Sequence, residues 1–377
     1  MDEQMARRQF LGKTGASAAA ALGVISEGAG AAGSADKPGG IGQTSASPSN
    51  GTPLVEPTAM ISGVLLADSF DSPHLDAALW SRPNWMTEHN PYIAVGPVNG
   101  RLEISGISRP TGTQHQYIGI LSKYFRETDV VLATRLRVHS PFEKPGRIQH
   151  HVHLCTGDWP DFFTEIIFGK ISTGPPRWYA AYLDRIWVYS GFNDYLEPTL
   201  PATGTEGADW QTVLIEHDGI TGRTQNYLIL GKEWKPVGPS HILKFNHSHV
   251  ELKVDVNAVE APVHMEFDDV RLYPNPAHNP ATIVVSSRVV GAGPEFPINN
   301  LRVRIQEESS GLLLGEATTD EGGQARVLLS RTVLYPVAAI IEVWDQHKLL
   351  LNSRIPQYQV QGLYPGDVWA VLIPPRA

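Results

Sequence analysis

The sequence has a single cysteine, Cys155, among 377 residues. One cysteine cannot form a disulfide within the chain, and its position far from the amino-terminal segment predicts no lipid anchor there. Free cysteine is among the most frequently buried residue types. Its apolar surroundings therefore predict a small core residue and no nucleophile.

Long apolar runs and basic stripes are also missing. Beyond the amino-terminal segment, no stretch is apolar over the length that a bilayer span needs. We therefore expect no transmembrane segment once the amino-terminal segment, described next as an export signal, is removed. The 30 Lys and Arg residues are scattered and are outnumbered by 39 Asp and Glu residues, which gives a net charge of -9. This balance argues against a nucleic-acid partner.

The amino-terminal segment has the order of a processing signal. Arg7-Arg8-Gln9-Phe10-Leu11-Gly12-Lys13 precedes a short apolar run over residues 14–24 and a Gly/Ala/Ser tail over residues 28–35. This order is typical of twin-arginine export signals. It predicts a signal peptide over residues 1–35 and a periplasmic or secreted protein. The Pro/Gly/Ser/Thr-rich residues 36–58 predict a flexible linker.

From Ile61 onward there is no helical period, and short β-type runs alternate with turn clusters. In residues 249–256 every valine and leucine falls on one strand face and every polar residue on the other, which predicts one core face and one solvated face. Residues 130–138 repeat this pattern with Arg135 and Arg137 outward. About a dozen such runs predict an all-β fold of two stacked antiparallel sheets.

A cluster of Pro, Asn and His over residues 273–280 separates this series from a second one. We predict a β-sandwich over residues 59–274, which the resemblance described next makes a jelly roll, and a smaller β-sandwich over residues 281–377. Turn sequences such as Ser310-Gly311 and Asp320-Glu321-Gly322-Gly323 separate strands of the second series.

Several segments of the first domain together resemble the concanavalin A-like lectin/glucanase jelly roll: residues 66–71, Trp80, residues 117–123 and residues 265–273. Residues 300–305 and 316–325 are similar to the prealbumin-like accessory domains found beside extracellular enzymes. The first resemblance implies a glycan-binding groove on the outer face of one sheet. Lectins, binding modules, glycosidases and polysaccharide lyases share that scaffold, so it implies a carbohydrate ligand without choosing a reaction.

Histidines crowd into residues 147–154. In a strand, His150 points toward the core with its apolar neighbours, while Gln149, His151 and His153 line the opposite face. On the groove side this row would bind or cleave a glycan, and on the convex side it would only be solvated. Periodicity does not decide which face carries Glu165.

Nearby aromatic and charged residues favour the groove, because sugar rings stack on aromatic faces. The alternative places the large aromatic side chains in the core. The sequence thus predicts catalytic roles for His151, His153, Glu165 and Tyr189, and substrate-binding roles for Gln149, Arg185, Trp178 and Trp187.

Three functional classes stay open. Gln149-His150-His151 resembles the Gln-Ile-His motif of jelly-roll alginate lyases, which implies His151 with Tyr189 or Tyr182 in proton transfer and Arg185 or Gln149 on a uronate carboxylate. A glucanase-type hydrolase would need paired carboxylates, and Glu165 has no partner in its own strand. The third class is a non-catalytic glycan-binding or envelope structural protein.

Two metal sites are conceivable, and no organic cofactor is indicated. His151 and His153 would bind zinc if Glu165 or His217 supplied a third ligand. The polarity pattern slips after Phe267, which predicts a bulge at Asp268-Asp269. With Asp68 or Asp71 opposite, these carboxylates resemble the structural calcium site of jelly-roll glycan modules, so we predict calcium at Asp68, Asp268 and Asp269. The alternative is solvated turn residues.

Overall fold

The computed structural model describes residues 56–83, 92–109, 116–143, 146–156, 162–170, 174–184, 196–257, 260–287 and 296–374. Within these ranges the regular elements are all β-strands, which confirms the all-β prediction. The described part of the chain contains no helix that is long and apolar enough to cross a membrane. The proposed export signal lies outside the described residues.

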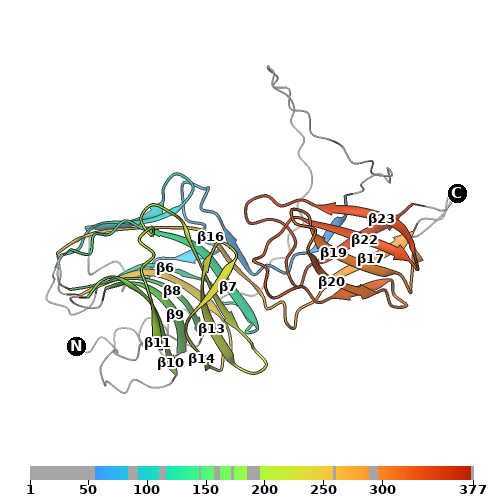
Figure 1. Ribbon diagram of the computed structural model, residues 1–377. Coiled ribbons are helices and arrows are strands. Elements are labelled where there is room, and N and C mark those ends of the chain that lie inside the picture. Colours follow the sequence, from blue (N-terminus) through green and yellow to red (C-terminus); the bar gives the residue numbers. More distant parts are fainter. Residues whose placement is uncertain are drawn as a thin grey trace, which may run out of the picture. The chain divides into compact units, whose positions relative to one another are not determined.

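One layer of the larger sandwich is a seven-stranded antiparallel sheet (Figure 1). Its strand order is β11 (Leu196–Pro201), β10 (Arg177–Asp184), β9 (Phe162–Lys170), β8 (Arg147–Thr156), β15 (His249–Asn257), β6 (Gln116–Ser122) and β3 (Trp80–Ser81). Strands β8 and β15 are thus central neighbours, although about a hundred residues separate them along the chain.

The second layer is an eight-stranded antiparallel sheet. Its order is β14 (Glu233–Ile242), β13 (Arg223–Leu230), β12 (Gln211–His217), β7 (Val130–Val138), β16 (Pro262–Pro274), β5 (Leu102–Ile107) and β4 (Ile93–Pro97), with β2 (Leu66–Asp68) also paired to β16. Alternate residues of both sheets form one hydrophobic core, including Val152, Val254, Leu132 and Phe267. This two-sheet packing follows from the period-two apolar pattern.

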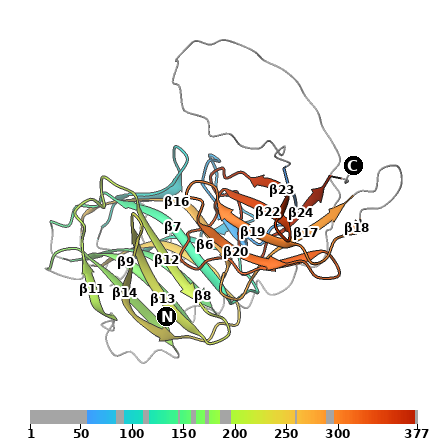
Figure 2. The same ribbon diagram turned by 45° about the vertical axis from the view of Figure 1, so that its right-hand side comes forward.

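The smaller sandwich also has two sheets, drawn mainly in orange and red in Figure 2. One contains β1 (Thr58–Ile61), β24 (Val368–Ile373), β17 (Ala281–Ser287), β18 (Phe296–Pro297) and β21 (Gln324–Val327). The other contains β20 (Leu313–Thr318), β19 (Arg302–Glu307), β22 (Ala339–Asp345) and β23 (Lys348–Ile355). Strands β17 and β24 pair in parallel, and the remaining pairs are antiparallel.

Strand β1 corrects the predicted start of the first domain. Thr58 and Ala59 pair with Ala370 and Trp369 of β24. Residues 59–61, which the sequence analysis assigned to the jelly roll, therefore belong by hydrogen bonding to the smaller sandwich. Local pattern could not reveal this, because the partner strand lies about three hundred residues later.

The bulge predicted in β16 is confirmed. The pairing of β16 with β7 shifts register between Asp268 and Arg271, and Asp269 has a positive φ of 50°. Aspartate tolerates this left-handed conformation better than most non-glycine residues. The side chain of Thr134 donates to the Asp268 carbonyl oxygen at 3.0 Å and so helps to hold the bulge.

The solvated face predicted for β15 is wrong. Its alternation is as expected, but the polar residues His249, Glu251, Lys253 and Asp255 are at most 3% exposed. By contrast, Arg135 and Arg137 of β7 remain partly exposed, as predicted. The outer face of the seven-stranded sheet is therefore polar and buried, an arrangement that requires partners for its charges.

Candidate functional site

The register of three neighbouring strands brings charged side chains together on that outer face. His153 of β8 is paired with Glu165 of β9 on one side and with Glu251 of β15 on the other. His151 is paired with Lys253. Because alternate residues share a face, these five side chains form one group. We refer to His151, His153, Glu165, Glu251 and Lys253 as the outer-face cluster.

His153 lies between the two carboxylates of the outer-face cluster. Its Nε2 atom contacts Glu165 Oε2, and its Nδ1 atom lies 3.0 Å from Glu251 Oε2. His151 Nδ1 is 2.8 Å from the same Glu165 oxygen. Lys253 Nζ donates to Glu251 Oε2 at 3.0 Å. The result is a continuous polar chain across β9, β8 and β15.

Burial and neighbouring charge act in opposition on these groups. Burial by itself would raise the pKa of Glu165, but His153 and His151 hold the pKa of that carboxyl well below its usual range. Burial likewise opposes ionisation of Glu251, yet Lys253 and His153 lower its pKa to about 2. Both carboxylates are therefore ionised at neutral pH.

The two histidines differ in their preferred charge. Burial and Lys253 disfavour a charge on His153, but Glu165 and Glu251 outweigh them and raise its pKa. For His151, burial dominates over the attraction of Glu165 and lowers the pKa. The surrounding charges therefore favour a proton on His153, between the two carboxylates, over one on His151.

Two atoms of the outer-face cluster lack a hydrogen-bond partner within the described structure, His151 Nε2 and Glu251 Oε1. A buried polar atom without a partner costs about 1–3 kcal/mol. These two atoms are therefore the positions at which a water molecule, a substrate hydroxyl or another ligand would satisfy the cluster.

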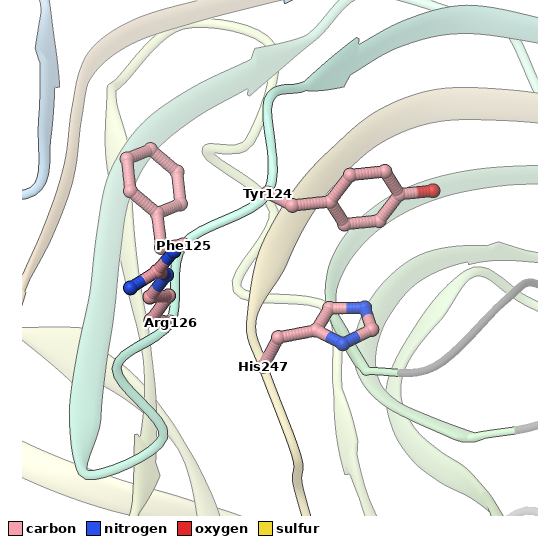
Figure 3. Close-up of a pocket in the computed structure, with 4 residues that line it drawn as sticks. All are labelled: Tyr124, Phe125, Arg126 and His247. Carbon is pink, nitrogen blue, oxygen red and sulfur yellow. The ribbon is translucent and has the colours of Figure 1, made fainter. Parts of the chain in front are cut away.

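An aromatic pocket of about 330 Å³ involves the segment after β6, and its lining residues are Tyr124, Phe125, Arg126 and His247. Figure 3 shows the rings of Tyr124 and His247 beside each other. The Tyr124 ring also meets the edge of His249 at a centroid distance of 4.7 Å. Since His249 precedes Glu251 by two residues on the same face of β15, this strand connects the pocket to the outer-face cluster.

Gln149 lies on the predicted face but carries a different local contact. It is fully buried, and Arg147 Nε donates to its side-chain oxygen. Arg147 also pairs with Asp255 of β15 at 3.1 Å. The Gln149 side chain, which was predicted to contact substrate, therefore already accepts a hydrogen bond from Arg147 on its own strand.

Trp178 does not lie on the outer face, which corrects its predicted substrate-binding role. It is completely buried in the core between the sheets, and its indole donates to Glu206 at 3.0 Å. Its pairing with Phe168 places both rings inside the sandwich. The core alternative was correct for this residue, because strand parity and not residue type decides the face.

The remaining predicted aromatic and arginine sites, Tyr189, Arg185 and Trp187, lie outside the described residues. Tyr182, the other tyrosine considered for proton transfer, stacks on His241 at a centroid distance of 4.3 Å.

His217 is not the third partner of the histidine pair. It lies on β12 of the opposite sheet, where its Nδ1 atom is 2.8 Å from Thr224 Oγ1 and its ring stacks on Phe245. Glu165 contacts both histidines instead. Its side chain therefore lies on the outer face of the sheet, which the local sequence pattern had left undecided.

The predicted calcium ligands face donor groups of the chain. Asp268 and Asp269 both pair with Arg135, and one Asp68 oxygen accepts the Trp80 indole N–H at 2.7 Å. Asp68 does lie beside the bulge, since it pairs with Val270. A calcium ion prefers several convergent oxygens without a competing cation. The side-chain arrangement around Arg135 therefore does not fit such an ion.

Sequence reasoning missed Glu251 and Lys253. Their strand was recognised, but its polar face was interpreted as solvated because charged residues are seldom fully buried. The signal in the sequence was that His, Glu, Lys and Asp alternate strictly with apolar residues along β15, which places both charge signs on one strand face. It became informative only once β15 was placed beside the histidine-rich β8.

No protein-family model and no curated protein matches the sequence. Solved structures with similar folds include one from work on endo-acting O-glycanases that human gut bacteria express to initiate mucin breakdown. It has 13% identity and a TM-score of 0.42, over 56% of this chain and 98% of that one. A Bacillus licheniformis β-glucanase has 11% identity and a TM-score of 0.39, over 57% and 99%. A Bauhinia forficata lectin in complex with GalNAc has 9% identity and a TM-score of 0.34, over 53% and 95%. Similarity at this level assigns neither a family nor an activity to this chain.

Proposed function

We propose that the protein binds and cleaves a polysaccharide or glycoside at the outer-face cluster. The observation that supports this most is the burial of two ionised carboxylates, Glu165 and Glu251, on either side of His153. Strongly perturbed ionisable groups gathered in one place are typical of reaction centres. A purely structural sheet face would be satisfied more cheaply by apolar side chains.

The chemistry of the cluster suits cleavage of a glycosidic bond. Such reactions use a pair of carboxylates or a carboxylate with another proton-transfer group. Glu165 found no partner in its own strand, but Glu251 supplies one from β15. His151 Nε2 and Glu251 Oε1, the two buried atoms without partners, would bind sugar hydroxyls or the attacking water once substrate has entered the site.

The aromatic pocket supports a sugar ligand. Tyr124 is about half exposed and borders His247, so it offers a ring face beside polar groups. Carbohydrate sites combine an apolar wall with a few polar contacts of this kind. In this proposal the pocket holds a part of the glycan while the bond to be cleaved lies nearer the outer-face cluster.

The test is mass spectrometry of products after incubation of the protein with neutral and uronate-containing polysaccharides and small glycosides. Unsaturated products establish a lyase, and hydrated products establish a hydrolase. Glu251→Gln and Glu165→Gln should each reduce turnover about 100-fold or more. Glu103→Gln is the matched control, because Glu103 is a carboxylate on the eight-stranded sheet and should leave turnover unchanged.

A non-catalytic glycan-binding protein is the second candidate. The observation in its favour is that most polar atoms of the outer-face cluster already have partners within the chain. In this case no substrate yields products, whereas Tyr124→Ala weakens retention on a glycan that the wild-type protein binds. Absence of both products and binding would reject both candidates.

We also propose export by the twin-arginine route, on the basis of Arg7 and Arg8 before the short apolar run. Replacing both arginines with lysine should retain the full chain in the cytoplasm, as measured by cell fractionation and immunoblotting. Unchanged export of the doubly substituted chain would contradict this proposal.

A further inference from the structure

We infer that His151, His153 and Glu165 bind one divalent transition-metal ion, and that zinc suits the three donors best. These residues have imidazole and carboxylate donors, the set found in zinc sites with two histidines, one glutamate and an open position for water. The inference goes beyond the proposed function, because it concerns metal binding and would stand for a non-catalytic protein as well.

The three donor atoms converge closely enough for one ion. His151 Nδ1 lies 2.8 Å from Glu165 Oε2 and 3.3 Å from His153 Nε2, and His153 Nε2 also contacts Glu165 Oε2. Ligand atoms about 2 Å from a tetrahedral zinc ion are about 3.3 Å apart. Only small side-chain movements are therefore needed to admit an ion among these atoms.

Burial and fixed strand positions favour the site. The three residues are at most 7% exposed, and they come from two adjacent antiparallel strands. Sites on paired strands hold their ligands more rigidly than sites on loops. Little ordering entropy would remain to be lost when the ion binds.

Glu251 provides the outer contact that metal-binding histidines usually have. Its Oε2 atom lies 3.0 Å from His153 Nδ1 and so favours the tautomer with the proton on Nδ1. That tautomer leaves the Nε2 lone pair free for the ion. Lys253 donates to the same Glu251 oxygen and in this way keeps the second carboxylate ionised beside the site.

The charges also balance with an ion present. With both imidazoles neutral, Glu165, Glu251 and Lys253 give the cluster one net negative charge. A divalent ion would change this to one positive charge, which a bound hydroxide would neutralise. His151 Nε2, on the other side of the ring from the ion, would then carry its proton and could donate to a water molecule there, which would satisfy its missing hydrogen bond.

Two other groups of potential ligands in the described residues are less suitable. His153, Cys155 and Glu251 also converge, but the Cys155 sulfur is 4.0 Å from His153 Nδ1, and burial raises the pKa of its thiol well above the usual value. On the other sheet, Glu266 is already paired with Arg101 and Arg137. A cation would have to displace those arginines.

The test uses the full chain without a histidine tag. It is stripped with a chelator, loaded with excess zinc chloride and desalted, and its bound metal is measured by inductively coupled plasma mass spectrometry. We expect about one zinc per chain, and loading with cobalt should give the visible bands of a tetrahedral site. Zinc should also raise the melting temperature, because ligand binding stabilises the folded state.

His151→Gln and Glu165→Gln should each reduce retained zinc at least about tenfold and abolish the thermal shift. His249→Gln is the matched control, since it is a buried histidine on the same sheet outside the three ligands and should retain zinc. Circular dichroism checks that each variant is folded. Wild-type protein that retains less than about one-tenth of an equivalent overturns the inference without reference to any variant. The measurement does not involve glycan turnover, so either proposal can fail alone.

Discussion

The two outer faces of the larger sandwich each place a buried carboxylate among basic residues, but they differ in access to water. Glu251 of the seven-stranded sheet and Glu266 of the eight-stranded sheet are 0% and 2% exposed. Glu251 is paired with Lys253 and His153, whose side chains are 3% and 2% exposed. Glu266 is paired with Arg101 and Arg137, whose side chains are 29% and 21% exposed.

On both faces a carboxylate on an outward strand position pairs with basic side chains, but the energetic consequences differ. Around Glu266 the arginines keep part of their hydration, so these ion pairs have a small desolvation cost and contribute modestly to stability. Around Glu251 every charge has left water, so each depends on its partner. The function proposed above would account for such a costly arrangement on this face.

The largest expected effect is that of removing Glu251. Glu251→Ala leaves Lys253 and His153 buried without their common carboxylate, so it should reduce the free energy of unfolding by about 3–5 kcal/mol. Glu266→Ala leaves arginines that can turn to solvent and should cost about 1 kcal/mol. Urea denaturation of both variants measures the difference. Equal losses would remove the distinction between the two faces.

The next effect compares the inner and outer faces of the seven-stranded sheet. Trp178→Phe removes an indole that fills the core and donates to Glu206, and it should reduce the free energy of unfolding by about 2–3 kcal/mol. Glycan affinity should be unchanged, as checked by affinity electrophoresis in parallel with thermal melting. Loss of affinity in a fully folded variant would restore a binding role to Trp178.

A pH measurement tests the inner histidine His217, whose pKa is shifted in the opposite direction to that of His153 in the outer-face cluster. Burial is the main cause that lowers the pKa of His217 to about 4, with His241 opposing and Asp218 favouring its charge. Its unfolded pKa is near 6.5, so the unfolded chain binds the proton more readily between these values.

The contribution of His217 to stability should therefore be constant above about pH 6.5 and fall toward pH 4, with a loss of about 2 kcal/mol at pH 5. In His217→Gln, the difference in unfolding free energy between pH 7.5 and pH 5 should be smaller by that amount. An unchanged pH dependence would show that folding does not lower the pKa of His217.

The smallest expected effect concerns the bulge carboxylates. Arg135 already compensates Asp268 and Asp269, so millimolar calcium should shift the melting temperature by less than about 1 °C. Differential scanning fluorimetry with magnesium as the control cation checks this. A larger shift that is specific for calcium and lost in Asp268→Asn would support the calcium site predicted from the sequence.

Local sequence was sufficient wherever strand periodicity and turn chemistry decided the structure. The slip after Phe267 predicted the bulge, and the alternation in β8 correctly separated His150 from His151 and His153. His150 bonds to the Phe168 carbonyl and to Ser140 on the core side. The same reasoning could not assign Glu165, because apolar residues flank it at both parities.

The sequence by itself determined an all-β chain, the strand faces of β8 and the residue types of a candidate reaction centre. Only the tertiary structure decided that Glu251 and Lys253 complete that centre, that Trp178 lies in the core and that β1 joins the smaller sandwich. The physical reason is that periodicity acts over a few residues and fixes which way a side chain points. Strand pairing acts across hundreds of residues and fixes which charges must leave water together.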